Sequence, residues 1–219
     1  MSGARTAAPA APRRGRGRRP VERVRADVME LVASVLLTEG LGALTIDRVA
    51  RESGVSRTTI YKLWPSIGSL ALDGYFHAVE QELAFPDTGD IRADLTSQLR
   101  SFTRLMTTTP AGRIVLELIG RAQTDPDLAV EFRRMYSSHR RRLATHRMRE
   151  AQEAGQLRPD LDLESLVDQL WGAVYHRLLV PDQPVDEAFA VRLVDNLFRG
   201  IGPELTPAGA AGPVGVDQG

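Results

Sequence analysis

The sequence predicts an all-α fold of about nine helices, divided between an N-terminal three-helix domain and a larger C-terminal helical domain. Between residues 21 and 202, apolar residues recur at intervals of three and four, without the period-two alternation of a half-buried strand. The pairs Thr109-Pro110 and Asp125-Pro126 each combine a capping side chain with a proline suited to the first helical position. Glycines and prolines elsewhere mark the ends of the periodic segments.

The two ends of the chain lack this periodicity. Residues 1–20 are rich in Ala, Pro, Gly and Arg and predict a disordered basic arm. The arm has no apolar stretch of the kind that a secretory signal requires. Residues 203–219 predict a flexible tail without lysine or arginine.

The amino-acid composition restricts the cellular compartment and the kinds of binding site that the chain can form. The chain has no cysteine, which excludes disulfides and thiolate metal sites and fits a reducing environment. The most apolar late run, residues 163–180, is interrupted by charged side chains and is not expected to span a membrane. We therefore expect a cytoplasmic protein without membrane contact.

Charge is unevenly distributed along the 219 residues. The 28 basic side chains balance the 28 acidic ones, so the net charge alone indicates no partner. Residues 1–64 carry 12 basic and 6 acidic side chains. Residues 65–219 carry 16 basic and 22 acidic side chains. A basic front on an acidic body indicates that the front of the chain binds a polyanion.

Three helices are expected in residues 21–66. The first covers about residues 21–38 and ends at the glycine that follows shortly after. The second is short, begins after the capping side chain of Thr45 and ends before Gly54. The third begins at the cap Ser56 and must end before the next proline, which cannot continue a helix.

Six further helices are expected in residues 67–202, a helical regulatory and dimerisation domain. Each is identified by an apolar stripe and limited by prolines, glycines or capping side chains. Their expected positions are about 66–85, 91–106, from 110 onward, 126–154, 163–180 and 186–199.

Two short helices joined by a tight glycine turn are what a helix-turn-helix motif requires. With Ile60 as the buried reference and about 100° per residue, Thr58 and Lys62 fall on the opposite face of the second helix. Lys62 is the only lysine beside 27 arginines. The residues predicted to face DNA are Arg57, Thr58, Thr59, Tyr61 and Lys62.

These side chains suit a DNA groove. Arginine and lysine can donate to guanine edges, threonine methyls can touch thymine methyls, and tyrosine hydroxyls can reach phosphates. The helix start at Thr45 can add backbone amides for a phosphate. A short exposed helix in an ordinary bundle would show the same periodicity, so the motif alone leaves both interpretations open, and the basic front end favours DNA.

Residues 36–75, LLTEGLGALTIDRVARESGVSRTTIYKLWPSIGSLALDGY, resemble the TetR family of bacterial transcriptional regulators. The resemblance rests on motifs that follow one another in the family's order. They are Gly40, Thr45-Ile46, Val49-Ala50, Gly54-Val55-Ser56, Thr59-Ile60-Tyr61 and Trp64-Pro65-Ser66.

The resemblance implies that Thr45 lies by the DNA backbone and that the five residues named above on the second helix of the motif face the DNA. Two departures reduce the expected contacts. Ile67-Gly68 stands where the family often has a phosphate-directed lysine followed by glutamate, and Leu63 stands where a polar residue is common. The arginines of the arm can supply what is missing by lying along the minor groove or the phosphates, and a disordered leader that only keeps the protein soluble is the alternative. They are Arg13, Arg14, Arg16, Arg18 and Arg19.

For the C-terminal domain, the resemblance implies a homodimer formed by the last two helices and a pocket for an unknown small-molecule effector. The expected dimer contacts are Leu166, Leu170, Phe189, Leu193 and Leu197. Aromatic rings with polar tips suit an amphipathic ligand, although such residues at helical spacing are more often plain core. The candidate pocket residues are Phe102, Met106, Met135, Tyr136, Trp171 and Tyr175.

An arginine cluster between residues 133 and 149 is compatible either with an acidic ligand or with a solvated helix face. It comprises Arg133, Arg134, Arg140, Arg141, Arg142, Arg147 and Arg149.

Catalysis is not indicated. We find no nucleophile motif, no glycine-rich phosphate loop and no metal-ligand spacing, and we expect no catalytic residues, no metal and no cofactor. The sequence therefore predicts a ligand-responsive repressor that binds a pseudo-palindromic double-stranded DNA operator as a dimer. A helical small-molecule-binding module and an architectural DNA binder without inducer response stay open as alternatives.

Overall fold

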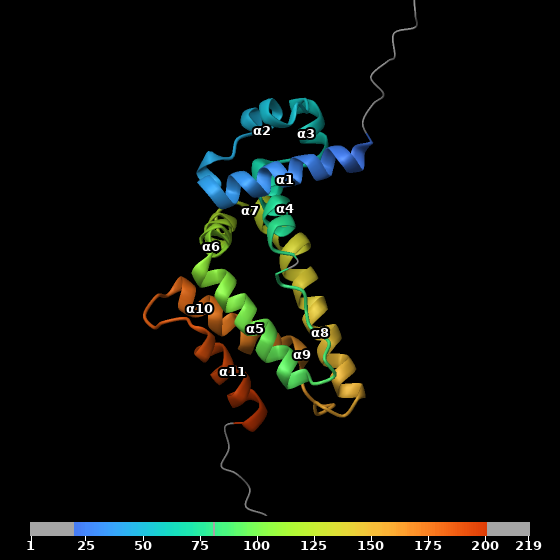
Figure 1. Ribbon diagram of the computed structural model, residues 1–219, viewed down its shortest axis with the longest axis vertical. Helices are drawn as coiled ribbons and strands as arrows, with labels where there is room; N and C mark the ends of the chain where they lie inside the picture. The colour runs from blue at the N-terminus through green and yellow to red at the C-terminus, as the bar shows by residue number, and fades with distance from the viewer. Residues whose placement is uncertain (1–19, 81, 201–219) are drawn as a thin grey trace, which may run out of the picture.

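The computed structural model describes residues 20–80 and 82–200, and all regular structure in these ranges is helical. The first helices lie together at one end of the elongated molecule, and α4 leads from them toward the others (Figure 1). Their bounds are α1 (Val21–Glu39), a 3₁₀ turn η1 (Leu41–Ala43), α2 (Ile46–Ser53), α3 (Arg57–Leu63) and α4 (Ile67–Val79).

The remaining helices form the larger part of the molecule. They are α5 (Ile91–Thr108), α6 (Pro110–Ala122), α7 (Pro126–Phe132), α8 (Ser138–Glu153), α9 (Leu163–Val167), α10 (Ala173–Leu179) and α11 (Glu187–Arg199). Two π-helical turns, η2 (Arg133–Ser137) and η3 (Asp168–Gly172), join α7 to α8 and α9 to α10 without a break. When these joined runs are counted as single helices, the described residues contain nine, which confirms the predicted fold class.

Two elements differ from the sequence prediction. Helix α4 ends at Val79 rather than near residue 85, yet Leu83 remains buried and its carbonyl accepts a hydrogen bond from Gln98 Nε2 at 3.0 Å. The apolar stripe therefore continues after the helix has ended. The sequence does not predict the π-turns, because one extra residue in a turn hardly disturbs the apolar pattern of a helix.

The predicted helix starts are confirmed by their capping hydrogen bonds. Thr45 Oγ1 accepts from the Arg48 amide at 3.2 Å, and Ser56 Oγ accepts from the Thr59 amide at 3.2 Å. Asp125 Oδ1 caps α7 by accepting from the Leu128 amide. These side chains satisfy amides that have no partner inside their own helix.

Helix α4 packs into both parts of the molecule. On one side it crosses α1 so closely that a Cβ atom on Gly74 would lie 2.3 Å from Val32 Cγ1. On the other side it contacts α6, α7 and η2. One continuous core runs from Val28 to Val194 through both sets of helices. No rigid boundary therefore separates α1–α3 from the rest.

A buried ion pair fixes the start of α5 against α8. Asp94 is fully buried and accepts hydrogen bonds from Thr88 and from Arg147 Nη2, the latter at 2.9 Å. Burial by itself would raise the pKa of Asp94, but these hydrogen bonds outweigh it and hold the pKa below its usual value.

Every helix in the described ranges is too short or too polar to cross a lipid bilayer.

The turn between α5 and α6 depends on a glycine, which gives a stability prediction. A Cβ on Gly112 would lie 1.9 Å from the Met106 carbonyl oxygen, whereas a Cβ on Gly120 of the same helix would meet nothing within 4 Å. Gly112→Ala should destabilise the fold by about 1–3 kcal/mol or more, and Gly120→Ala should stabilise it by up to about 1 kcal/mol. Thermal unfolding followed by circular dichroism would show melting temperatures displaced in opposite directions; equal temperatures would contradict the described turn.

Candidate DNA-binding surface and ligand cavity

The helix-turn-helix is formed by α2 and α3, with the connecting turn opened by Gly54. Gly54 has φ 69°, in the left-handed region that favours glycine. Val49 of α2 and Ile60 of α3 are fully buried between the helices. Ile60 is therefore the inward-facing residue of α3 that the sequence predicted, and the opposite face is free.

The free face of α3 carries four of the five predicted side chains in exposed positions. They are Arg57, Thr58, Tyr61 and Lys62, and the Tyr61 side chain is 52% exposed. Thr59 is half-buried, and its hydroxyl lies 2.9 Å from that of Ser56, so it also helps to hold the start of the helix. Thr45 is exposed at the start of α2.

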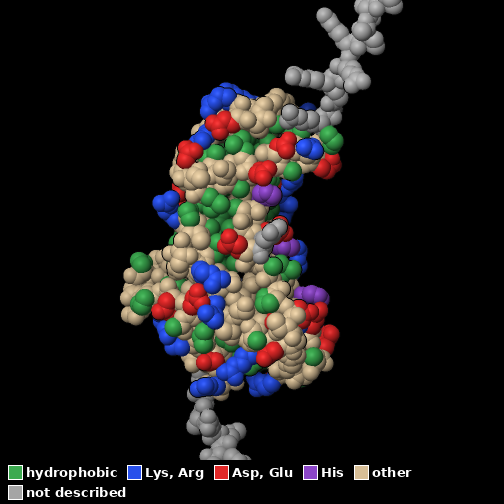
Figure 2. Space-filling view, viewed as in Figure 1, with side chains coloured by type: hydrophobic (Ala, Val, Ile, Leu, Met, Phe, Trp, Pro, Cys, Tyr) green, Lys and Arg blue, Asp and Glu red, His purple; other side chains and the backbone are tan. Residues whose placement is uncertain are grey.

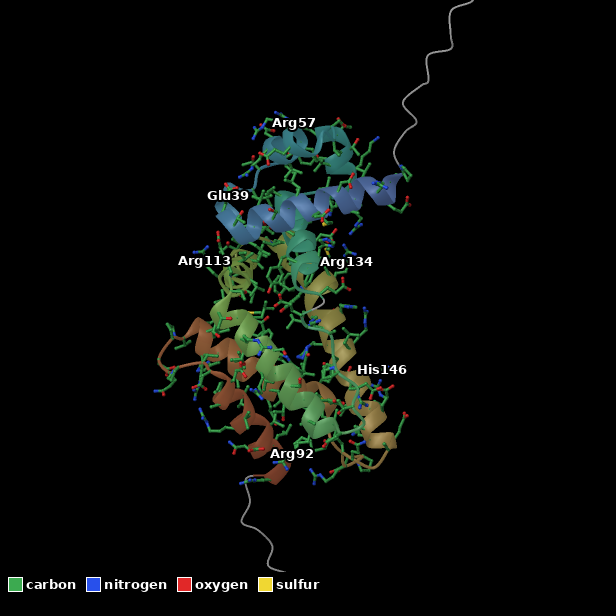
Figure 3. All side chains as sticks on the ribbon, in the orientation of Figure 1. Glu39, Arg57, Arg92, Arg113, Arg134 and His146 are labelled. Carbon is green, nitrogen blue, oxygen red and sulfur yellow. The ribbon has the colours of Figure 1, made fainter. Side chains whose placement is uncertain are left out.

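Ion pairs occupy the arginines of the motif but not its lysine. Arg48 pairs with Glu39 at 2.6 Å and with Glu52 at 3.0 Å. Arg51 also pairs with Glu52 at 3.0 Å, and Arg57 pairs with Asp47 at 2.9 Å. Glu39 lies at the far end of α1, and Arg57 at the tip of the molecule (Figure 3). Among the cations of α2 and α3, Lys62 alone makes no ion pair with any residue that the structure describes.

The basic excess at the front of the chain does not come from the motif. Residues 20–64 contain six basic and six acidic side chains, so their net charge is zero. The whole excess of residues 1–64 lies in the first nineteen residues, which include the five arginines of the predicted arm. Those arginines lie outside the described residues.

The C-terminal end of α3 is tied to α4 through Asp73. Trp64, which follows α3, is 2% exposed and its Nε1 donates to Asp73 Oδ2 at 2.8 Å. Arg25 of α1 pairs with the same carboxylate and lies over the Trp64 ring, 5.6 Å from its centroid. One largely buried carboxylate therefore joins α1, α3 and α4.

A cavity of about 210 Å³ lies among the C-terminal helices. Four of the six predicted pocket residues line it: Phe102, Tyr136, Trp171 and Tyr175. The structure does not bring the two methionines there. Met106 is buried at the end of α5 where α6 begins, and Met135 is turned roughly a quarter of a turn from Tyr136. The other residues around the cavity include Leu83, Phe85, Gln98, Arg140, Arg141 and Asp168.

Both π-turns supply walls of this cavity. Tyr136 and Ser137 come from η2, and Asp168 and Trp171 come from η3. The hydroxyls of Tyr136 of η2 and Tyr175 of α10 lie 2.7 Å apart in a hydrogen bond. Tyr136 also stacks on Phe76 of α4 with ring centroids 4.8 Å apart. A side chain that lines the cavity therefore touches α4, the helix whose Asp73 binds Trp64 at the end of α3.

The cavity wall includes Arg140, which sequence reasoning had placed only in a general arginine cluster. Its position four residues after Tyr136 puts both on one helix face, a spacing that would have singled it out. Burial lowers the pKa of Arg140 from its usual value. Burial also raises the pKa of Tyr136, and raises those of Tyr75 and Tyr175 well above the usual tyrosine range.

The predicted dimer contacts occupy two kinds of position. Leu166, Leu170 and Phe189 are buried in the protomer's own core, so they cannot present side chains to a partner without rearrangement. Leu193 and Leu197 of α11 are only half-buried. Helix α11 packs on α5, where Arg92 pairs with Asp195 at 2.7 Å and Arg100 with Glu187 at 2.6 Å. Basic and acidic side chains accordingly alternate over this part of the visible face (Figure 2).

The fold and the motif together define a helix-turn-helix DNA-binding regulator with a separate ligand-sized cavity. Within the described residues, no cluster of three or more histidine or acidic side chains is placed to hold a metal ion. A family model described as "Bacterial regulatory proteins, tetR family" matches residues 32–73, and one described as "Tetracyclin repressor-like, C-terminal domain" matches residues 85–197. The chain belongs to the TetR family of DNA-binding transcriptional regulators.

Individual relatives agree with this assignment over most of the chain. The HTH-type transcriptional regulator YdeS of Bacillus subtilis is 31% identical over 186 residues, covering 85% of this chain and 93% of the relative. The DNA-binding transcriptional repressor TetR of Mycobacteroides abscessus is 27% identical over 176 residues, 79% of this chain and 90% of the relative. The crystal structure of the TetR family transcription regulator SCO0332 is 65% identical, with a TM-score of 0.80, and the match covers 83% of this chain and all of that chain.

The free face of α3 can be tested by substitution. Lys62→Ala and Tyr61→Ala should each lower operator affinity by about tenfold or more, because each removes an exposed group from the face expected to meet DNA. Asp47→Asn should raise operator affinity, because it frees Arg57 from its ion pair and removes a negative charge. Gel retardation with the purified variants measures these changes.

Arg142→Ala provides the control, because Arg142 is exposed on α8 and outside the motif. If Lys62→Ala bound operator as tightly as Arg142→Ala does, α3 would not present this face to DNA.

Proposed function

We propose that this regulator is a ligand-responsive repressor that binds a pseudo-palindromic operator as a dimer and acts in the bacterial cytoplasm. The observation that carries the proposal is a shared helix: within one turn of α4, Asp73 binds Trp64 at the end of α3 and Phe76 stacks on Tyr136 of the cavity wall. The named repressor activity of the Mycobacteroides abscessus relative favours repression over activation. Regulators of this family bind DNA operators and small-molecule effectors, typically as dimers.

The route from cavity to DNA follows three residues of α4. Phe76 stacks on Tyr136, and Tyr75 meets the same ring edge-on with centroids 6.2 Å apart. Asp73 lies within one turn of them and binds Trp64 and Arg25. A ligand that displaces Tyr136 would move this turn of α4. The turn would then carry the end of α3 with it.

Ligand binding can release DNA only through a difference in affinity between two states. The ligand must bind the DNA-incompetent arrangement more tightly, and a ligand with equal affinity for both would shift nothing. We propose that the DNA-incompetent arrangement is the one in which the ligand separates Tyr136 from α4.

A dimer would place two copies of α3 about one DNA turn apart, roughly 34 Å. The last two helical runs of the chain are the proposed interface. Because Leu166, Leu170 and Phe189 are already buried, the contacts would come from half-buried Leu193 and Leu197 together with neighbouring exposed side chains of α10 and α11. A two-fold dimer requires a self-complementary patch, which in turn predicts a pseudo-palindromic operator.

We propose that the basic arm supplies the long-range attraction that the neutral motif lacks. Replacing its five arginines, Arg13, Arg14, Arg16, Arg18 and Arg19, by glutamine should lower operator affinity. It should also reduce the dependence of log K on log salt, because fewer counterions are released from DNA. Affinity measured over a series of salt concentrations checks both effects. An unchanged slope would exclude the arm from DNA binding.

Selection of bound sequences from a random DNA pool tests the proposed function as a whole. The full-length protein should enrich a pseudo-palindrome whose half-sites are centred about 10 base pairs apart or a multiple of that spacing. Enrichment of no sequence, with DNA bound at all sites alike, would favour an architectural DNA binder. Absence of DNA binding would favour a helical small-molecule-binding module.

A further inference from the structure

The arginines between residues 133 and 149 fall into distinct environments. Arg134 pairs with Glu131, and Arg147 with Asp94. Arg141 pairs with Asp168 and lies 3.5 Å from Glu164. Three others, Arg133, Arg142 and Arg149, are exposed to water. Arg140 differs from all of these, because it is half-buried in the cavity wall and makes no hydrogen bond or ion pair with any residue of the described ranges.

An unpaired guanidinium in this position costs free energy. Burial removes part of its hydration, and no carboxylate replaces the lost water. The acidic side chain whose charge acts on it is Glu80, which is exposed and forms no ion pair with it. The one carboxylate in the cavity lining, Asp168, is already neutralised by Arg141. The cavity therefore has an excess of positive charge at Arg140.

Two tyrosine hydroxyls, those of Tyr136 and Tyr175, line the cavity together with this cation. Tyr75 is not part of the lining, and its ring meets the Tyr136 ring edge-on with centroids 6.2 Å apart. The Tyr75 hydroxyl is fully buried and has no hydrogen-bond partner among the described residues, which is rare in a folded protein. Tyr136 and Tyr175 share one hydrogen bond, which uses only one of their two protons. Because burial raises their pKa values, all three hydroxyls keep their protons and can donate.

The rest of the lining is largely apolar and aromatic. Phe85, Phe102 and Trp171 contribute rings, and Leu83 and Val167 contribute aliphatic surface. A cavity of about 210 Å³ exceeds the roughly 150 Å³ that suffices to bind benzene in an engineered protein cavity. The space therefore fits one or two rings or a short chain, with a small polar group at one end.

We propose that the cavity binds a compact amphipathic carboxylate, with its anionic group on Arg140 and the hydroxyls of the Tyr136–Tyr175 pair. Its apolar part would lie among Phe85, Phe102 and Trp171. A carboxylate has about four acceptor positions, and Arg140 and the hydroxyls supply unused donors for them. The binding of this ligand is independent of the proposed function. Its role as the effector that releases DNA rests on the proposed function.

Isothermal titration of the full-length protein tests the proposal with matched acids and amides. The pairs are benzoate and benzamide, 2-naphthoate and 2-naphthamide, and octanoate and octanamide, each titrated up to about 5 mM so that affinities in the millimolar range register. At least one acid should bind about tenfold or more tightly than its amide, as expected for charge-assisted hydrogen bonds. Equal affinities within every pair, or no binding by any acid, would overturn the proposal.

Variants of one helix locate the binding group. Arg140→Gln should remove the preference for the acid, and Arg140→Lys should retain part of it because the charge remains. Arg142→Gln makes the same change in net charge on the same helix, outside the cavity, and should keep the full preference. A preference that survives Arg140→Gln as fully as it survives Arg142→Gln would refute the role of Arg140.

Tyr175→Phe tests the hydroxyl pair, with Tyr75→Phe as the matched control. Tyr175→Phe removes a hydroxyl that lines the cavity and keeps the ring, so the affinity for the acid should fall. Tyr75→Phe removes a buried hydroxyl outside the lining, so the affinity for the acid should stay the same and the melting temperature should stay the same or rise. An acid affinity of Tyr175→Phe equal to that of Tyr75→Phe would exclude the Tyr175 hydroxyl from the binding site.

Operator retardation with each acid and amide tests the carboxylate site and the effector role separately. Arg140-dependent acid binding that leaves the operator complex intact would uphold the carboxylate site and contradict the effector role. Release of operator by the amides as readily as by the acids would uphold ligand-responsive regulation and overturn the carboxylate site.

Discussion

Helix α4 must pack against α1 and against α6, α7 and η2 with one set of side chains, and much of the structure follows from this constraint. Gly74 lets α1 approach so closely that no larger residue fits without a shift. Asp73, next to it, holds Trp64 and Arg25, while Tyr75 and Phe76 point their rings at Tyr136. Four consecutive residues thus face the DNA-binding helices and the cavity wall in turn. A displacement at either end of this segment is difficult to absorb locally, because close-packed interiors do not deform continuously.

The distribution of ion pairs explains why a single lysine matters in a chain that otherwise uses arginine. Arg48, Arg51 and Arg57 are engaged with carboxylates on α1 and α2, and these exposed pairs contribute little stability each. Their main effect is to neutralise the motif. Lys62 remains as an uncompensated charge on the free face of α3, where a flexible ammonium can adapt to a base edge or a phosphate.

The sequence predicted those features that local chemistry determines. Caps such as Thr45 and Ser56, the left-handed Gly54 and the inward face at Ile60 follow from side-chain hydrogen bonding, backbone freedom and helical geometry. The π-turns η2 and η3 could not be predicted, because one extra residue in a turn hardly disturbs the apolar pattern of a helix. Apolar periodicity identified Leu166 and Phe189 as buried, but a pattern within one chain does not show which chain buries them. Met106 and Met135 were assigned to the pocket from residue type alone, and residue type does not show in which direction a side chain points.

Arg140 shows how tertiary context gives different roles to identical residues. Seven arginines within seventeen residues of one helical run are indistinguishable by composition, yet the fold pairs three, exposes three and encloses one beside buried tyrosines. A core built only for stability would place an apolar residue at this position, because a partly buried charge without a partner among the described residues opposes folding. Such a guanidinium in the wall of a largely apolar cavity is costly in the empty protein, and that cost is offset when an acceptor with negative charge enters.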